Sequence, residues 1–236
     1  MVRVLVEASC LVDARRDAGI GRYARQLIEA LGATPDVRLR LAKPARPPRS
    51  ESRPARFIHA QPVALRAAAR IRPDVLHGVG GEPVAGFPLL RQVVTVHDVE
   101  MWRGGRGSQM RDAALRAYGL TLAALIRECG AVIAVSRTSA QEAIQTLRLR
   151  SGRVHVVPEG AGTQFNADKV ASDADKVHDA GLEPGGYILW VGSLRHHDPR
   201  KGLDVLVEAV ARLGTDSPVL ALAGADGPEA ARVRTF

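Results

Sequence analysis

The stretch QVVTVHD, residues 92–98, decides the fold of this chain. It is a nearly uninterrupted apolar run that ends in two polar residues, His97 and Asp98. The same design recurs on either side along the chain, in PDVLHG at 73–78 and in AVIAVS at 131–136. Such short apolar runs are typical of strands that are buried on both faces, as in a parallel sheet covered by helices. We therefore predict an α/β fold with a parallel sheet.

Further segments extend this pattern in both directions. Helical spacing of apolar residues predicts four helices, and short apolar or alternating runs predict three more strands. The helices are expected at 21–31, 61–71, 108–128 and 137–149, the last capped by Ser136, and the strands at 2–8, 37–42 and 153–160. Residues 43–56 contain four prolines and five basic residues without an apolar period, which indicates a mobile loop or linker.

The α/β pattern lapses and then restarts towards the end of the chain. A strand, a helix and a strand are predicted at 186–194, 202–213 and 218–224, and a final helix begins after them. We expect three regions: an N-terminal Rossmann-like domain at 1–165, a linker at 166–185, and the first part of a second domain at 186–236. Because roughly 50 residues are few for a stable core, we expect this second domain to be truncated.

The composition is that of an ordinary globular protein. Hydrophobic residues make up 46% of the 236 residues, and no apolar run approaches the ~18 residues of a membrane span. The first residues do not resemble a signal peptide, so the cytoplasm is the expected location. The two cysteines, Cys10 and Cys129, lie far apart in apolar surroundings, and we expect buried, reduced thiols rather than zinc ligands.

The chain is basic, with a net charge of +8. This excess indicates either an anionic partner or a solvated surface. Aromatic residues make up only 4%, which is few for base stacking, and no nucleic-acid-binding motif is present. We therefore expect no specific nucleic-acid partner, whereas an anionic membrane surface stays open.

Two glycines precede the first predicted helix. Gly19, Gly21 and Ala24 spell G-x-G-x-x-A, the phosphate-binding fingerprint of dinucleotide folds. In that fingerprint the first glycine directly follows strand one, but here ten residues separate Ala8 from Gly19, and Asp36 precedes the second strand instead of closing it. A dehydrogenase is therefore disfavoured. The glycines fit either an anion-binding helix start or a plain flexible loop.

A set of short motifs, taken in order, favours the anion-binding interpretation. They are GIGRYARQLIEAL, DVLHG, VVTVHDV, VIAVSRTSAQEAI, RVHVVPEGAGTQF and YILWVGSLRHHDPRKGLDVLVEAV. Together they resemble the family 4 glycosyltransferases, retaining nucleotide-sugar enzymes of the GT-B fold. The resemblance runs from about Val4 to Gly224. It implies two Rossmann-like domains with parallel sheets, the second incomplete here, with the donor bound mainly by the second domain.

The resemblance also implies roles for residues of the first domain. The Gly19–Gly21 segment would lie over the donor diphosphate, with the positive end of the following helix directed at it. His97 matches a histidine that lies near the transferred sugar in the family, and it follows a strand where open α/β sheets place ligands. Asp98 is a second catalytic candidate, although it would serve equally to orient the loop. His77 closes another strand and ranks lower.

The segment RHHDPRKG supplies the remaining candidates, Arg195, Arg200 and Lys201. In the family, an arginine and the lysine of such a segment bind the donor phosphates and stabilise the leaving nucleoside diphosphate. No metal and no cofactor are then needed. Ser193 occupies the family's usual arginine position, so Arg195 is the substitute, and the family's paired donor-binding glutamates would lie beyond Phe236.

The resemblance implies transfer of a hexose, with mannose from GDP-mannose as one candidate, to a hydroxyl acceptor with retention. The acceptor would be a glycan or a lipid-linked group, in glycan, polysaccharide or glycolipid synthesis, and the inner face of the membrane is an alternative location. We expect residues 1–236 alone to be inactive. The alternative is a basic binding module for nucleic acid or an anionic membrane without catalysis. A nucleotide-sugar epimerase is disfavoured because YGLTL at 118–122 lacks the required lysine.

Overall fold

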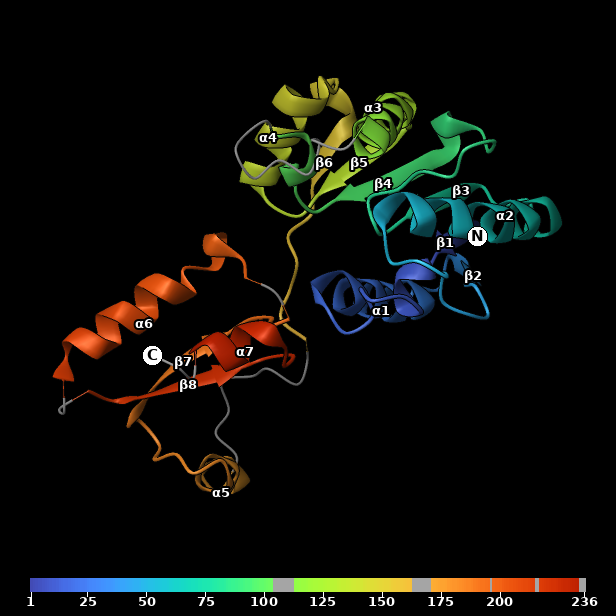
Figure 1. Cartoon of the computed structure of the whole chain (residues 1–236). Helices are drawn as coiled ribbons and strands as arrows, with labels where there is room; N and C mark the ends of the chain where they lie inside the picture. The colour runs from blue at the N-terminus through green and yellow to red at the C-terminus, as the bar shows by residue number, and fades with distance from the viewer. Residues whose placement is uncertain (104–112, 163–170, 196, 215–216, 234–236) are drawn as a thin grey trace. The chain divides into compact units, whose positions relative to one another are not determined.

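The computed structural model divides the chain into two compact units, Met1–Gly162 and Thr163–Phe236 (Figure 1). The first unit is the larger of the two. The structure describes residues 1–103, 113–162, 171–195, 197–214 and 217–233.

The first unit is built on a six-stranded parallel sheet with the strand order β2-β1-β3-β4-β5-β6. Its strands are β1 (Val2–Glu7), β2 (Val37–Ala42), β3 (Val75–Gly78), β4 (Gln92–Val96), β5 (Ala131–Ala134) and β6 (Val154–Val156). The parallel α/β prediction is confirmed, because each predicted strand is present and every pair is parallel.

Helices cover both faces of this sheet. Successive side chains of β1 point to opposite faces and pack with different helices. Val4 and Val6 pack with α1 (Gly19–Gly32), whereas Leu5, which points to the opposite face, packs with α2 (Arg53–Ile71). The other half of the sheet packs against α3 (Ala113–Glu128) and α4 (Arg137–Leu147). Both cysteines are buried and free, as predicted.

The start of α4 confirms the predicted cap. Ser136 has an extended backbone, and its Oγ accepts a hydrogen bond of 3.0 Å from the backbone N–H of Ser139. This bond satisfies one of the N–H groups that the first helical turn leaves without a partner. The Ser139 hydroxyl in turn donates to the carbonyl of His97 at 3.2 Å, so the cap also ties α4 to the end of β4.

The start of α2 differs most from the sequence prediction. Helix α2 begins at Arg53 and continues through Pro62. The last four residues of the predicted loop at 43–56 are therefore helical. Ser52 followed by Pro54 is the usual N-cap and first-turn proline pattern, which the proline count had obscured. The predicted helix at 108–128 is seen as α3 from Ala113, and residues 104–112 lie outside the described part.

The second unit holds a two-stranded parallel sheet of β7 (Tyr187–Val191) and β8 (Val219–Ala223). Helix α6 (Leu203–Arg212) connects the strands and α7 (Pro228–Val233) follows them, as the sequence predicts. Within the predicted linker, the structure has a charged helix, α5 (Ala171–Asp179), in which Lys176 pairs with Asp173 one turn away. Residues 163–170 lie outside the description. Among the described helices of the chain, none is both long and apolar enough to cross a bilayer.

Candidate functional site

The strand order of the first unit marks where a ligand is expected. The chain runs outward from β1 to β2 and then returns to place β3 on the other side of β1. In open α/β sheets, ligands bind at the carboxyl ends of strands beside such a reversal. A pocket of about 230 Å³ lies there, lined by residues that follow β1, β3 and β4 and by residues of α1, α2 and α3.

His97 directly follows β4 at this edge of the sheet and lines the pocket. Its side chain is 16% exposed. The Nε2 atom lies 2.9 Å from the carbonyl oxygen of Val79, so Nε2 is the donor in this hydrogen bond. The Nδ1 atom lies 3.3 Å from a carboxylate oxygen of Glu159, which sits in the VVPEG segment after β6. Both ring nitrogens therefore face oxygens, and these contacts fix the orientation of the ring.

A second histidine contacts the strand that precedes His97. His77 is buried at the end of β3, and its Nε2 lies 2.8 Å from the hydroxyl of Thr95. The same hydroxyl lies 2.9 Å from that of Tyr23, whose ring meets the His97 ring edge-on at 4.9 Å. Burial lowers the pKa of His77 to about 4, so this ring is neutral at neutral pH. His77 is therefore a buried, neutral group that does not line the pocket.

Asp98 follows His97 and also lines the pocket, but it is exposed. Its Oδ1 accepts a hydrogen bond of 3.1 Å from the backbone N–H of Glu100. This contact closes the turn after β4, so the geometry agrees with an orienting role for Asp98.

A buried charge cluster underlies the pocket, and the sequence analysis did not single it out. The guanidinium of Arg15 forms three hydrogen bonds with the carboxylate of Asp13, two at 3.1 Å and one at 2.6 Å, and pairs with Glu82 at 3.3 Å. The hydroxyl of Tyr118 donates to the other oxygen of Glu82 at 2.6 Å. Glu7, at the end of β1, accepts from the backbone N–H of Ser9 at 2.8 Å.

Glu7 is the carboxylate of this cluster with the fewest compensating contacts. Burial, and to a smaller degree the neighbouring charge of Glu82, raises its pKa to about 7. Glu82 and Asp13 each have a guanidinium partner, whereas Glu7 has only a hydrogen bond from Ser9. The proton on Glu7 therefore lowers the cost of burying three carboxylates together.

We expect Glu7→Gln to flatten the pH dependence of stability. The pKa of Glu7 is about 7 in the folded state and near its ordinary 4.5 in the unfolded state. The wild-type chain therefore loses up to roughly 3 kcal/mol of folding free energy as the pH rises from 4.5 to 7, whereas the amide of the variant has no such proton to lose. Urea denaturation at pH 5 and pH 8 measures the effect. An equal difference between variant and wild type at the two pH values would contradict this prediction.

The two glycines before Tyr23 are Gly19 and Gly21. Both lie in the first turn of α1, because this helix begins at Gly19. The backbone N–H of Gly21 already donates to the carbonyl of Arg15 at 3.1 Å, and a Cβ at Gly21 would lie 2.2 Å from the carbonyl oxygen of Arg16. Close backbone packing thus requires this glycine. Gly19 has open space where a Cβ would be, and its N–H has no partner among the described residues. Only Gly19 therefore offers a free donor for an anion.

The two alanine substitutions are expected to separate these roles. Gly21→Ala should destabilise the first unit by roughly 1–3 kcal/mol, because backbone atoms must move to admit the methyl group. Gly19→Ala should leave stability unchanged or slightly raised, since alanine is the better helix former. Urea denaturation gives both values. Equal stability of the two variants would show that the close approach at Gly21 relaxes without cost.

The basic segment of the second unit lies between β7 and α6. The guanidinium of Arg200 forms two hydrogen bonds with Asp198, at 2.9 and 2.8 Å, and these hold the pKa of Asp198 below its usual range. Lys201 is exposed at the end of the turn Pro199–Lys201, and in the described part of the chain its ammonium has no carboxylate within ion-pair distance. Arg195 is also exposed. Lys201 and Arg195 are thus more available to an anionic ligand than Arg200.

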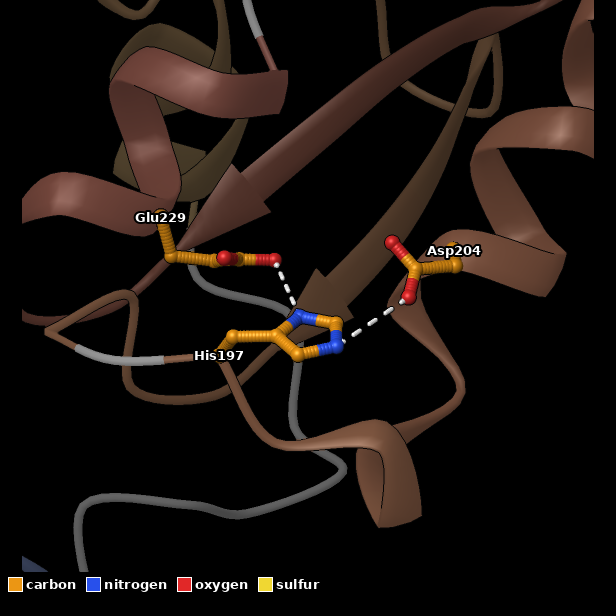
Figure 2. Close-up of side chains that lie close together, drawn as sticks. All are labelled: His197, Asp204 and Glu229. Carbon is orange, nitrogen blue, oxygen red and sulfur yellow. Dashed lines mark hydrogen bonds and ion pairs between the residues drawn. The ribbon is translucent and has the colours of Figure 1, made fainter.

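A cluster of His197, Asp204 and Glu229 lies beside this segment (Figure 2). The imidazole lies between the two carboxylates, with Nδ1 3.2 Å from Glu229 and Nε2 3.6 Å from Asp204. Imidazole and carboxylate are metal-ligand types. However, the guanidinium of Arg232 pairs with both carboxylates, so a metal cation there would be repelled. We interpret the cluster as an ion-pair network that holds the basic segment against α6 and α7.

The sequence profile of one family, described as Glycosyltransferase Family 4, matches residues 18–165. The chain belongs to this family. The family match includes α1, the whole pocket edge of β3 and β4, and the VVPEG segment with Glu159. It thus covers His97 and its contacts, while the basic segment at 195–201 lies outside the matched residues.

Solved structures support the same fold. WaaG, a glycosyltransferase involved in lipopolysaccharide biosynthesis, is 16% identical with a TM-score of 0.68, over 99% of this chain and 67% of that one. A glycosyltransferase from Rickettsia africae is 14% identical with a TM-score of 0.61, over 99% of this chain and 63% of that one. HepE of Anabaena, solved with UDP-glucose, is 16% identical with a TM-score of 0.50, over 96% and 70%. At these identities the likeness establishes the GT-B fold.

The chain spans 63% of the length of the Rickettsia glycosyltransferase structure. No curated protein matches its sequence significantly.

Residues that line the pocket from distant parts of the chain were missed by the sequence analysis. They are Arg15, Arg53, Arg56, Glu82 and Tyr118. A Ser-x-Pro helix start before Arg56 was a usable signal for α2. The pairing of Glu82 with Arg15 and Tyr118 had no local signal, because these residues are 67 and 36 positions apart.

Proposed function

We propose that the protein transfers a hexose from a nucleotide diphosphate sugar to a hydroxyl of an acceptor, with retention of configuration. The family membership of the first unit carries this proposal. The geometry of that unit supports it, because His97 is held by two oriented contacts beside a pocket at the carboxyl edge of the sheet. HepE, one structural neighbour, was solved with UDP-glucose, which supports a nucleotide-sugar donor.

Retention is proposed to occur by front-side displacement. The bond between the anomeric carbon and the diphosphate oxygen breaks, the acceptor oxygen bonds to the same face, and its proton passes to the leaving phosphate. The carboxylates of the pocket favour this scheme over a covalent intermediate. Glu82 is occupied by Arg15 and Tyr118, and Asp98 is bonded to its own turn, so neither is poised as a nucleophile.

Lys201 and Arg195 are proposed to neutralise the donor diphosphate. Cations that face the leaving group stabilise the charge that develops on it in the transition state. They would serve in place of a metal ion, and no cofactor is proposed. The acceptor is proposed to be a glycan or a lipid-linked group at the inner face of the membrane. Mannose is the first hexose to test.

Calorimetric titration with UDP, GDP and their hexose conjugates tests the donor. Assays of transfer, with NMR analysis of the anomeric configuration of the product, test the reaction. Saturable binding of one nucleotide and a retained configuration are expected. Salt-dependent binding to DNA or anionic vesicles, without saturable binding of any nucleotide sugar, would instead support the basic binding module.

A further inference from the structure

A second cavity of the first unit lies towards the amino ends of its strands, away from the edge that holds the candidate site. Its volume is about 270 Å³, and we call it the arginine cavity. Among the residues that the structure describes, none of its lining groups is acidic. The lining consists of Arg3, Arg38, Arg40, Arg70 and Ile71.

Strand pairing and strand period bring these arginines together. Arg3 of β1 is paired in register with Arg38 of β2, and neighbouring strands lie only about 5 Å apart. Arg40 follows two positions later and therefore shares the face of Arg38. Ala42, the next residue on that face, packs in the core beneath α2. Arg70 comes from the last turn of α2, so two strands and one helix direct arginines into the same cavity.

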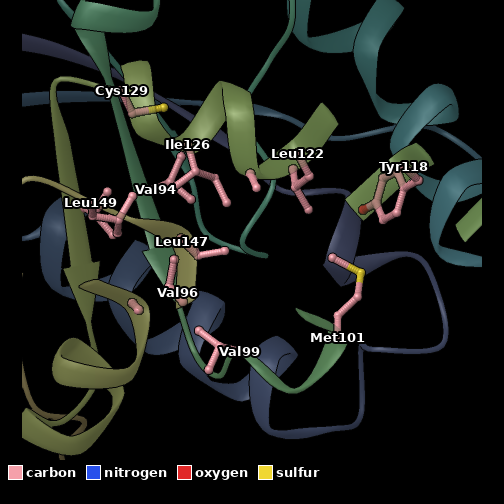
Figure 3. Packing of buried hydrophobic residues seen from close by; sticks show 13 residues of the cluster. Val94, Val96, Val99, Met101, Tyr118, Leu122, Ile126, Cys129, Leu147 and Leu149 are labelled. Atoms are coloured by element: carbon pink, nitrogen blue, oxygen red, sulfur yellow. The ribbon is translucent and has the colours of Figure 1, made fainter. Parts of the chain in front are cut away.

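Apolar side chains fill the comparable space elsewhere between this sheet and its helices. Val94 of β4 packs with Ile126 of α3 in the buried cluster of Figure 3. Because β2 is an edge strand, charged residues on it hinder pairing with another chain. Protection of the edge does not explain Arg3 on the interior strand β1 or Arg70 on a helix.

A single carboxylate serves this group of arginines in the described part of the chain. The guanidinium of Arg3 forms two hydrogen bonds with Asp74, at 3.1 and 2.8 Å. These bonds hold the pKa of the Asp74 carboxyl well below its usual range. Arg91 pairs with the same carboxylate at 3.7 Å. The charge of Asp74 is therefore already shared by two arginines and does not neutralise the other three in the cavity.

Those three arginines have few compensating contacts. Arg40 donates to the carbonyl of Leu39 at 3.1 Å. Arg38 and Arg70 form no hydrogen bond or ion pair within the ranges that the structure describes. The carbonyl end of α2 offsets only part of the charge of Arg70. Like charges so close together repel one another, and a bound anion would remove this repulsion.

We propose that the arginine cavity binds an oligophosphate, a compact anion with two or more linked phosphate groups. A phosphate group carries a charge of about −1.5 to −2, so two of them balance the three arginines that lack a carboxylate. The guanidinium fork matches phosphate oxygens in a bidentate manner. The cavity is smaller than the roughly 300–1,000 Å³ of sites for drug-sized ligands, which suits a compact ion. Its lining has no aromatic ring for a base to stack on, so the phosphates themselves are recognised.

Calorimetric titration of residues 1–236 with pyrophosphate, at constant ionic strength, tests this site. Saturable binding to the wild-type chain is expected, and Arg38→Ala and Arg70→Ala should each weaken it roughly tenfold. Arg66→Ala is the matched control, because Arg66 is exposed one turn before Arg70 on the same helix and does not line the cavity. It should bind like the wild type. Circular dichroism checks that each variant folds.

Lys201→Ala separates this site from the proposed donor segment of the second unit. Its affinity for pyrophosphate at the arginine cavity should equal that of the wild type. If Lys201→Ala abolishes all pyrophosphate binding while Arg38→Ala and Arg70→Ala change nothing, the anion belongs to the donor segment and the arginine cavity is not a site. Sulfate that binds as tightly as pyrophosphate would also overturn the proposal, because the cavity would then accept any small anion.

The same titration with UDP and GDP identifies the source of the linked phosphates. Nucleotide binding to Lys201→Ala that Arg38→Ala weakens supports a nucleoside diphosphate as the ligand. Arg38-dependent binding of pyrophosphate without such nucleotide binding supports a free oligophosphate. A short DNA duplex that displaces pyrophosphate and binds more tightly, in an Arg38-dependent manner, would show a nucleic-acid surface instead and overturn the proposal.

Discussion

His97→Ala is expected to lower kcat by roughly 100-fold or more while donor affinity changes little. Such a loss is typical when a polar group that acts in the transition state is removed. His97 has both ring nitrogens fixed, by Val79 and Glu159, at the carboxyl edge of the sheet beside the pocket. Its contacts with a reacting sugar should therefore matter most as the anomeric bond breaks. Steady-state kinetics measures kcat, and calorimetric titration with the donor measures donor affinity. Both experiments use a form of the protein that shows transfer.

His155→Ala provides the matched control for this experiment. His155 is exposed on β6 and does not line the pocket, so its loss should leave kcat unchanged. Thermal unfolding of both variants separates a chemical role from a structural one. An unchanged kcat in His97→Ala, or its failure to fold, would mean that the ring merely joins β4 to Val79 and Glu159.

Lys201→Ala is expected to weaken nucleoside diphosphate binding roughly 10- to 100-fold. A charge-assisted hydrogen bond contributes about 1.5–3 kcal/mol, and each ~1.4 kcal/mol is tenfold in affinity. Lys201 is exposed just before α6, where the positive end of that helix adds to its charge. Arg195→Ala should have a smaller effect, and Arg200→Ala the smallest, because Arg200 is already bonded to Asp198.

Titration of each variant with UDP and GDP gives this order directly. Arg212→Ala is the control, since Arg212 lies at the other end of α6 and pairs with Glu208 on the surface. Wild-type affinity in Lys201→Ala, with the fold intact, would remove the reason for assigning the donor phosphates to this segment.

Most of the fold was predictable from local patterns. The runs that end at His77, His97 and Ser136 have the length and composition of doubly buried strands, and each is a strand of the parallel sheet. The Ser136 cap was predictable for the same reason, because one side chain and the next helical turn determine it. Local signals failed at α2, where the proline-rich composition concealed the helix start at Arg53.

The candidate site was predictable only in part. His97 and Asp98 could be named because the end of a buried strand is visible in the sequence, and the structure places both on the pocket lining. The close packing of Gly21 was not predictable, since its approach to the carbonyl of Arg16 depends on how the preceding turn folds back. The catalytic and phosphate-binding roles of the candidates stay predictions.

The sequence by itself determined the order of strands and helices and the family, because periodicity and short motifs are local properties of the chain. Only the tertiary structure decided which charges meet. Glu82 meets both Arg15 and Tyr118 because β1 and β3 are neighbours in the sheet and α3 packs against the adjoining half of it. Arg53 enters the same pocket because α2 covers that face of β1. These contacts between charged side chains depend on long-range packing, which determines both the burial of a charge and the partner that compensates it.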